Sequence, residues 1–197
     1  MARNMQPVLK RCRTLGIEPS VMGIDKTSNR NPKPMKKKQS EYGRQLTEKQ
    51  KVKFIYGMLE KQFRKYYEIA IKMPGIAGEN LLQILESRLD NVVFRLGLAN
   101  TRRESRQMVN HGHILVNGKR LDIPSYRVKV GDVITLKEKI ASTDRMKDVI
   151  EANSSRAIPK WLDMDKNTLT GKVIALAQRD DIDYEVEEHL IVELYSK

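Results

Sequence analysis

The sequence is poor in the residues that build disulfides, metal sites and membrane spans. Its 197 residues include one cysteine and three histidines, and aromatic side chains make up only 6%. A single thiol excludes an internal disulfide and any site built on several thiolates, and three histidines argue against a histidine-rich metal site. No uncharged apolar run approaches the roughly 18 residues that span a bilayer, and no apolar segment follows the basic start as in a secretory signal. These absences predict a soluble protein without membrane contact, cofactor or bound metal, and the single cysteine fits a reducing cytoplasm without proving one.

Groups of residues that could carry out catalysis or bind a nucleotide are also scarce. No nucleophile has a base and an orienting group beside it in the sequence, and no glycine-rich phosphate loop ending in Gly-Lys-Ser/Thr occurs. His111 and His113 flank Gly112 closely enough to suggest a metal, but two histidines without a third ligand are more typical of RNA-facing or surface groups. The sequence therefore predicts a protein that is not an enzyme.

Positive charge is what the sequence has in excess. Lysine and arginine number 37 against 25 aspartates and glutamates, for a net charge of +12. Residues 1–53 hold 14 basic and 4 acidic side chains, whereas residues 140–197 hold 8 and 12. Such an excess favours a polyanionic partner, with phosphate the first candidate. The acidic end is expected to face solvent or a basic neighbouring protein.

Residues 1–45 lack a sustained apolar period. The segment 31–38 combines two prolines with four lysines, which opposes both a helix and a core. We therefore expect a basic N-terminal arm. It could be a solvated tail, or it could become ordered on binding its partner.

Two amphipathic helices should follow the arm. After a capping box at Thr47, apolar side chains recur at three- and four-residue spacing over 52–70, which predicts a helix of about six turns with a basic opposite face. Leucines and valines over 81–96 predict a second helix that ends at Gly97. The tyrosines of the first helix lie on its apolar stripe, so packing in the core is favoured over stacking on bases.

The next segment concentrates positive charge on short elements. A second capping box at Thr101 predicts a helix from Arg102 to about Gly112, with Arg102 and Arg106 one turn apart on a common face. Free N–H groups at a helix start also attract anions, so a phosphate-sized group is favoured there.

Two hairpins and an acidic end complete the chain. Asn117-Gly118 predicts a type I′ turn, and 126–130 with 133–136 predicts a second hairpin. A helix near 144–153 and strands within 158–176 are expected to return the chain onto the helical lobe, with Trp161 as a packing anchor.

Three segments resemble the α-L RNA-binding module found in a ribosomal protein, some tRNA synthetases and pseudouridine synthases. They are Leu89-Asp-Asn-Val-Val-Phe-Arg-Leu-Gly97, Thr101-Arg-Arg-Glu-Ser-Arg-Gln-Met-Val109 and Ile114-Leu-Val-Asn-Gly-Lys119. The segments 48–57 and 59–63 and the ending 189–197 are similar to the S-four family, the fourth protein of the bacterial small ribosomal subunit. The resemblance implies a primary binder of the 5′ domain of small-subunit ribosomal RNA that nucleates assembly of the subunit body and contributes to translational accuracy.

The same resemblance implies which proteins lie nearby, and the sequence departs from the family pattern in one respect. Members of the family lie beside the fifth and twelfth small-subunit proteins, in the cytoplasm or in an organelle of bacterial descent. Many members hold zinc with four N-terminal cysteines, whereas Cys12 stands alone here. We therefore expect the zinc-free type, with the arm ordered by RNA and packing.

The expected fold class is α+β: a basic arm (1–45), a helical lobe (46–97 and 151–197) and an inserted α-L module (86–150). The side chains expected to contact RNA are basic or polar groups of these parts: Arg3, Arg11, Arg13, Lys36, Lys37, Lys38, Arg44, Lys49, Lys53, Arg64, Arg102, Arg103, Arg106, Gln107, His111, His113, Asn117, Lys119 and Arg120.

Two rival functions remain. An RNA-modifying or tRNA-charging enzyme could have borrowed the module, but it would need a catalytic domain that the flanking segments do not suggest. A free RNA chaperone or messenger-binding regulator differs only in its target, and repression of its own message stays open. Co-migration with small subunits would separate these functions.

Overall fold

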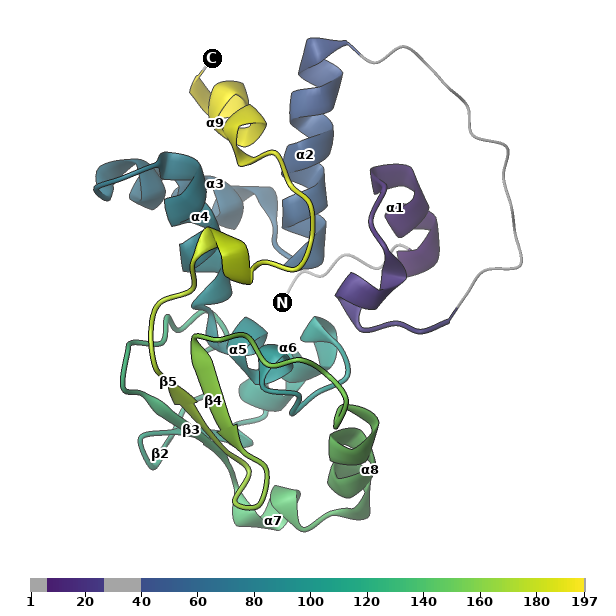
Figure 1. The fold of residues 1–197 in the computed structure, drawn as a ribbon, viewed down its shortest axis with the longest axis vertical. Coiled ribbons are helices and arrows are strands. Elements are labelled where there is room, and N and C mark those ends of the chain that lie inside the picture. Colours follow the sequence, from purple (N-terminus) through teal and green to yellow (C-terminus); the bar gives the residue numbers. More distant parts are fainter. Residues whose placement is uncertain (1–6, 27–39, 197) are drawn as a thin grey trace. The chain divides into compact units, whose positions relative to one another are not determined.

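The computed structural model describes residues 7–26 and 40–196, which divide into two compact units. Unit 1 combines the chain up to Leu81 with residues 183–197, and unit 2 comprises 82–182. The division falls inside helix α4 (Ala77–Glu86). Figure 1 shows helices in both units and a sheet in the second, an α+β fold as expected. In the described residues, no helix combines the length and apolar character that a membrane span requires.

Unit 1 contains the helices α1 (Val8–Leu15), η1 (Pro19–Met22), α2 (Glu41–Ile55), α3 (Glu60–Lys72) and α9 (Glu188–Ser196). The C-terminal α9 packs along α2 and is fixed by aromatic contacts. The Tyr67 hydroxyl donates to the Val192 carbonyl at 3.2 Å, and the Tyr67 and Tyr195 rings stack at 4.6 Å. All three tyrosines expected in the core, Tyr56, Tyr66 and Tyr67, are buried here.

Part of the expected arm is folded against this unit. Helix α1 contacts α2, and the Cys12 side chain is fully buried in the interior, where desolvation raises the pKa of its thiol. Gly16, with φ +68°, ends α1 in the left-handed conformation. Residues 31–38, which carry the lysine cluster, lie outside the described residues.

The prediction of a single long helix over 52–70 is wrong. Helix α2 begins earlier, at Glu41, where the Ser40 hydroxyl accepts from the Gly43 N–H at 3.2 Å. It ends at Ile55 because Gly57 adopts φ +61° and the Met58 N–H turns back to the Lys53 carbonyl. Apolar periodicity continues across this turn, which is why the sequence pattern concealed the break.

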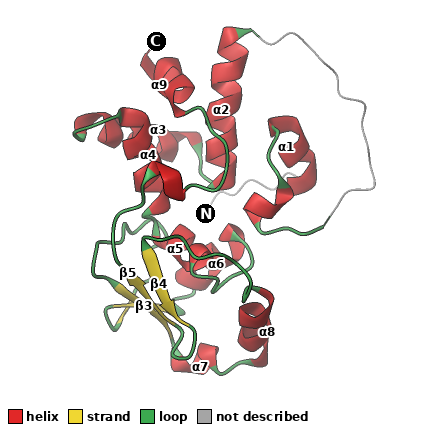
Figure 2. Cartoon of the chain, viewed as in Figure 1, coloured by secondary structure: helices red, strands yellow, loops and turns green. Residues whose placement is uncertain are grey.

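Unit 2 packs helices against a five-stranded antiparallel sheet of order β2-β1-β3-β5-β4. Its strands are β1 (Ile114–Val116), β2 (Lys119–Arg120), β3 (Val133–Leu136), β4 (Leu162–Asp165) and β5 (Thr170–Val173). Its other elements are α5 (Leu89–Arg95), α6 (Arg102–Asn110), α7 (Glu138–Ala141), α8 (Asp144–Ala152) and η2 (Arg179–Asp181). Figure 2 shows that the strands all belong to this part of the chain.

Two expectations for this unit are wrong for one reason. The helix expected over 81–96 breaks at Ser87 and Arg88, and the segment 126–130 forms no hairpin with 133–136. Instead Arg88 forms a bridge with Arg127, while the Val128 N–H donates to the Ser87 carbonyl at 2.8 Å. Backbone groups freed by the helix break are thus satisfied by the segment that would have paired with β3.

The strands after Trp161 also differ from expectation. They do not return to the helical lobe, because β5 pairs with β3 in the register Ile134↔Gly171. Leu96, after α5, lies directly on Gly171, where a larger residue would not fit. Trp161 is buried in the same core, as expected of a packing anchor, and α8 matches the helix predicted near 144–153.

Candidate nucleic-acid interface

Helix α6 begins where the capping pattern predicted. The Thr101 hydroxyl accepts from the Glu104 N–H at 3.2 Å, and the Glu104 carboxylate accepts from the Asn100 N–H at 2.9 Å. These bonds satisfy backbone donors at the helix start. The position of every arginine on α6 follows from this fixed first turn.

The three arginines of α6 lie in different environments. Arg102 is only 6% exposed: its Nε donates to the Asn91 amide oxygen at 2.8 Å, and its guanidinium lies 4.3 Å from the centre of the Phe94 ring. Arg106 is half-buried and donates through Nε and Nη2 to one oxygen of Asp90, at 2.8 and 2.6 Å. Arg103 is exposed. The helix therefore presents Arg103 outward and uses Arg102 in its packing against α5.

Ion pairs beneath α6 fix the helices of unit 2. Asp90 also accepts from Arg88 at 3.0 and 2.7 Å, so two guanidinium groups share one buried carboxylate. Glu86 accepts from Arg95 at 2.9 and 3.1 Å. Buried ions require such pairing because their desolvation costs several kcal/mol each. The sharing of Asp90 leaves a net positive charge near Arg106.

The hairpin turn between β1 and β2 has the predicted geometry. Asn117 and Gly118 have φ values of 51° and 75°, as a type I′ turn requires. The Asn117 side chain donates to Asp132 at 2.8 Å and accepts from the Val133 N–H at 2.9 Å. Asp132 also accepts from the Lys129 N–H at 2.8 Å. Asn117 thus holds two turns at the same end of the sheet.

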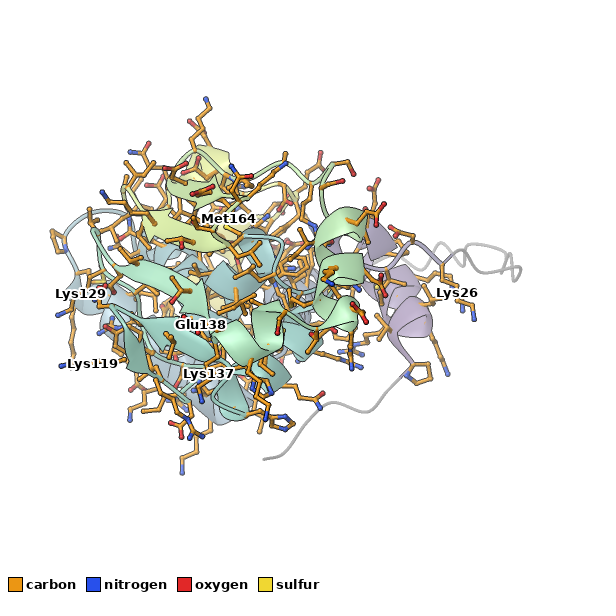
Figure 3. All side chains as sticks on the ribbon, turned by 90° about the horizontal axis from the view of Figure 1, so that it is seen from below. Lys26, Lys119, Lys129, Lys137, Glu138 and Met164 are labelled. Carbon is orange, nitrogen blue, oxygen red and sulfur yellow. The ribbon has the colours of Figure 1, made fainter. Side chains whose placement is uncertain are left out.

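Lysines extend from this end of unit 2. Figure 3 shows the exposed side chains of Lys119 and Lys129 on the same side of the view, and the Asn117–Asp132 contact joins the turns beside them. Lys119 is among the contacts expected from the sequence, whereas Lys129 is not. The proximity of Lys129 depends on the Asp132 contacts, which join turns that are separate in the sequence.

The loop between α6 and β1 gathers further cations. The guanidinium of Arg120 lies against Gly112, whose φ is +66°, and a methyl group added to Gly112 would overlap it. The His111 and His113 rings meet edge to face at 5.6 Å. The Lys137 N–H donates to the His113 carbonyl at 3.0 Å, which sets Lys137 beside the loop. Lys137 is not among the contacts expected from the sequence, because only the β1–β3 register brings it to His113.

Burial and charge both act on the imidazole of His113. Desolvation lowers the pKa of His113 below its ordinary value of 6.5, and the nearby positive groups His111, Lys137 and Arg120 lower it further. The free protein therefore disfavours protonation of His113. A negatively charged ligand at this loop would reverse the effect of its neighbours.

Two expected RNA contacts of unit 1 are engaged with an acidic side chain. Lys49 and Lys53 each lie 2.8 Å from Glu60, which also accepts from the Tyr195 hydroxyl at 2.7 Å. Desolvation raises the pKa of Glu60, but these three donors outweigh it and lower the pKa to about 2. Both lysines thus fix α2 to α3 in the free protein.

Of the remaining expected contacts of unit 1, Arg13, Arg44 and Arg64 are exposed and Arg11 is half-buried. Arg44 lies 3.4 Å from Glu187, and Arg64 lies 3.5 Å from Glu68. The Arg11 guanidinium donates to the Gln50 side chain at 3.4 Å. Arg13 on α1 and, in unit 2, Gln107 on α6 are exposed. Four expected contacts lie outside the described residues: Arg3, Lys36, Lys37 and Lys38.

Within residues 7–26 and 40–196, no cluster of three or more His, Cys, Asp or Glu side chains suits a metal ion. What unit 2 offers is a set of exposed or half-exposed basic side chains on a rigid scaffold. We define the basic surface by its residues: His111, His113, Lys119, Arg120, Lys129 and Lys137. Such a set suits phosphate groups, because histidine, lysine and arginine donate hydrogen bonds to phosphate oxygens.

Comparisons with known proteins match both parts of the chain. Residues 87–134 match the S4 domain, and residues 3–86 match the ribosomal protein S4/S9 N-terminal domain. The chain is 59% identical over 198 residues to the small ribosomal subunit protein uS4 of Lachnoclostridium phytofermentans, and 58% identical over 197 residues to that of Agathobacter rectalis. It is 50% identical over 198 residues to the uS4 protein of Fusobacterium nucleatum subsp. nucleatum. Each alignment covers 100% of both chains.

Proposed function

Because this chain belongs to the uS4 family of small-subunit ribosomal proteins, we propose that the basic surface of unit 2, together with Arg103, grips the backbone of small-subunit ribosomal RNA. The protein is a structural constituent of the small ribosomal subunit in the bacterial cytoplasm and binds ribosomal RNA. It is not an enzyme.

The arrangement of charge in unit 2 supports this proposal most directly. The Asn117–Asp132 contact fixes the turns that carry Lys119 and Lys129, and Arg120 rests on Gly112 beside the histidines. Cations on rigid elements lose little conformational entropy on binding, so they suit recognition of a fixed layout of phosphates. Recognition by shape is expected, because the deep major groove of A-form RNA hides its base edges.

The expected contacts have different roles in this proposal. Arg103, Gln107 and the basic surface reach RNA directly. Arg102, Arg106 and Asn117 position them, since the structure gives each of these side chains a partner inside unit 2. The basic residues before 40 and those of α1 and α2 add backbone contacts.

Finer aspects of the role follow the family resemblance. We place the binding site in the 5′ domain of the ribosomal RNA, where the protein nucleates assembly of the subunit body and later affects translational accuracy. Its protein neighbours are the fifth and twelfth small-subunit proteins. The carboxylates of residues 180–188 would face a basic neighbour.

Hydroxyl-radical footprinting on small-subunit ribosomal RNA tests the proposal. The variant Arg103→Ala/Lys119→Ala/Lys129→Ala removes three exposed charges of unit 2 without touching the buried ion pairs. A matched control, Lys147→Ala/Lys160→Ala/Lys172→Ala, removes three exposed charges elsewhere in the same unit. We expect the wild type and the control to protect one compact 5′-domain site and the first variant to lose it.

Two outcomes would contradict the proposal. Equal protection by both triple variants would show that unit 2 binds by another surface. Stronger binding to a transfer or messenger RNA than to the ribosomal RNA would favour the free chaperone or regulator.

A further inference from the structure

We infer that His113, Arg120 and Lys137 form a site for one RNA phosphate group, and that this site takes up a proton when the phosphate binds. The inference rests on the proposed function and adds a regulation to it: affinity for ribosomal RNA rises with acidity through one imidazole of the protein.

The geometry brings three kinds of basic side chain to one loop. Gly112 has no side chain and a left-handed φ, so the Arg120 guanidinium can lie directly on its backbone. The adjacent His113 is half-exposed, with His111 edge-on beside it. Lys137 follows β3 and is tied to His113 through the backbone. A guanidinium, an imidazole and an ammonium group therefore come from three separate elements.

The charges that face His113 are positive. They are His111 from the same loop, Arg120 from β2 and Lys137 from the end of β3. Glu138, which follows Lys137 in the sequence, is exposed at the start of α7 (Figure 3), and the groups that shift the pKa of His113 in the described part of the chain include no carboxylate. In the described residues, Arg120 and Lys137 have no ion pair with a carboxylate. The loop thus lacks the counter-ion that its charge requires.

A phosphate group supplies this counter-ion. Arg120 and Lys137 stay charged throughout the neutral range, so only the imidazoles can change charge on binding. Burial and the neighbouring cations lower the pKa of His113 in the free protein, and a phosphate oxygen in hydrogen-bond range raises it. Between the two pKa values binding takes up a proton, so affinity increases as the pH falls.

The size of the effect follows from linkage. Uptake of one full proton changes the binding constant by about tenfold per pH unit, and partial uptake changes it less. We expect a three- to tenfold gain in affinity for wild type between pH 7.5 and 5.5, beyond any change due to the RNA itself.

Equilibrium binding of the 5′-domain ribosomal RNA fragment at constant ionic strength, from pH 5.5 to 8, tests the inference. The variants are His113→Gln, which cannot titrate, and His189→Gln, which alters an exposed histidine of unit 1. Protonation of the RNA is common to all three proteins. We expect the wild type and His189→Gln to show the same slope of affinity against pH, and His113→Gln a flatter one.

A second readout follows the imidazole itself in the wild-type protein. The three histidines give three imidazole Hε1 signals in NMR, and comparison with His189→Gln and His113→Gln assigns all three. RNA binding should raise the titration midpoint of the His113 imidazole in the full-length wild-type protein. An unchanged or lowered midpoint, or parallel slopes for wild type and His113→Gln, would overturn the inference.

The inference and the proposed function fail in different ways. Specific protection of the ribosomal RNA with no protein-dependent pH effect would remove the proton-linked site and leave the RNA-binding role. Absence of specific binding by wild type at every pH would remove both.

Discussion

Replacing Glu86 by Gln removes the negative charge of a buried ion pair while keeping the size of the side chain. Glu86 is 1% exposed, and both its oxygens accept from Arg95, at 2.9 and 3.1 Å. Asn91 donates to the same carboxylate at 2.7 Å. The variant leaves the buried guanidinium without this charge, and breaking such a pair costs about 3–5 kcal/mol. That is a large part of the roughly 5–15 kcal/mol that stabilises a domain.

Urea unfolding followed by tryptophan fluorescence measures this loss of stability in unit 2, to which Glu86 belongs. Trp161 is the single tryptophan, and it is buried in the core of unit 2. With a urea dependence of about 2 kcal/mol per molar, the unfolding midpoint should fall by about 1.5–2.5 M. The control Asp163→Asn removes an exposed carboxylate of the same unit and should change stability by less than about 0.5 kcal/mol.

The double variant Glu86→Leu/Arg95→Met distinguishes the cost of leaving one buried ion unpaired from the cost of burying both ions. Replacing both ions by apolar groups of similar size is often neutral or stabilising, so the double variant should recover most of the stability. Asn91 keeps a partner there, because its side chain also donates to the Glu86 backbone carbonyl at 3.0 Å. A loss below about 1 kcal/mol in Glu86→Gln, or a double variant as unstable as the single one, would refute this reasoning.

Three further predictions concern single residues. Arg103→Ala should weaken RNA binding and reduce the slope of log affinity against log salt by about one, with the urea midpoint unchanged, in filter binding between 50 and 200 mM salt. Gly112→Ala should lower the free energy of unfolding by more than about 1 kcal/mol in urea, since the residue has φ +66° and Arg120 occupies the space of the methyl group. Glu60 has a pKa of about 2 in the folded protein, below its ordinary value of 4.5, so its stabilising effect is present above pH 4.5 and is lost as the pH falls toward 2. Thermal unfolding by circular dichroism should therefore show a smaller acid-induced loss in Glu60→Gln.

Features encoded within a few residues were predictable from the sequence. Thr101 caps α6, and Asn117-Gly118 turns the hairpin, because each signal needs only its own side chain and the next two or three backbone groups. The breaks at Gly57 and Arg88 were not predictable from apolar spacing. The apolar stripe runs on across both, and the break at Arg88 depends on a bridge to Arg127, whose position only the folded chain defines.

In the candidate site, the sequence likewise does not determine which charged side chains are buried and which are exposed. Arg102 and Arg103 are adjacent and chemically identical, yet one is buried against Asn91 and Phe94 and the other is exposed. A rotation of 100° per residue separates their directions, but the sequence does not say which direction faces α5. The deciding information is the position of Asn91 and Asp90 on a short helix that begins only because α4 breaks.

Strand register, and not spacing in the sequence, brings Lys137 and His113 together on the surface. They lie 24 positions apart and meet because β1 and β3 pair in the register Ile114↔Leu136, which places the ends of both strands together. Local composition predicts that the chain is basic, whereas strand register determines which cations act on one phosphate. A change that shifts the β1–β3 register should therefore weaken RNA binding even where every basic residue is retained.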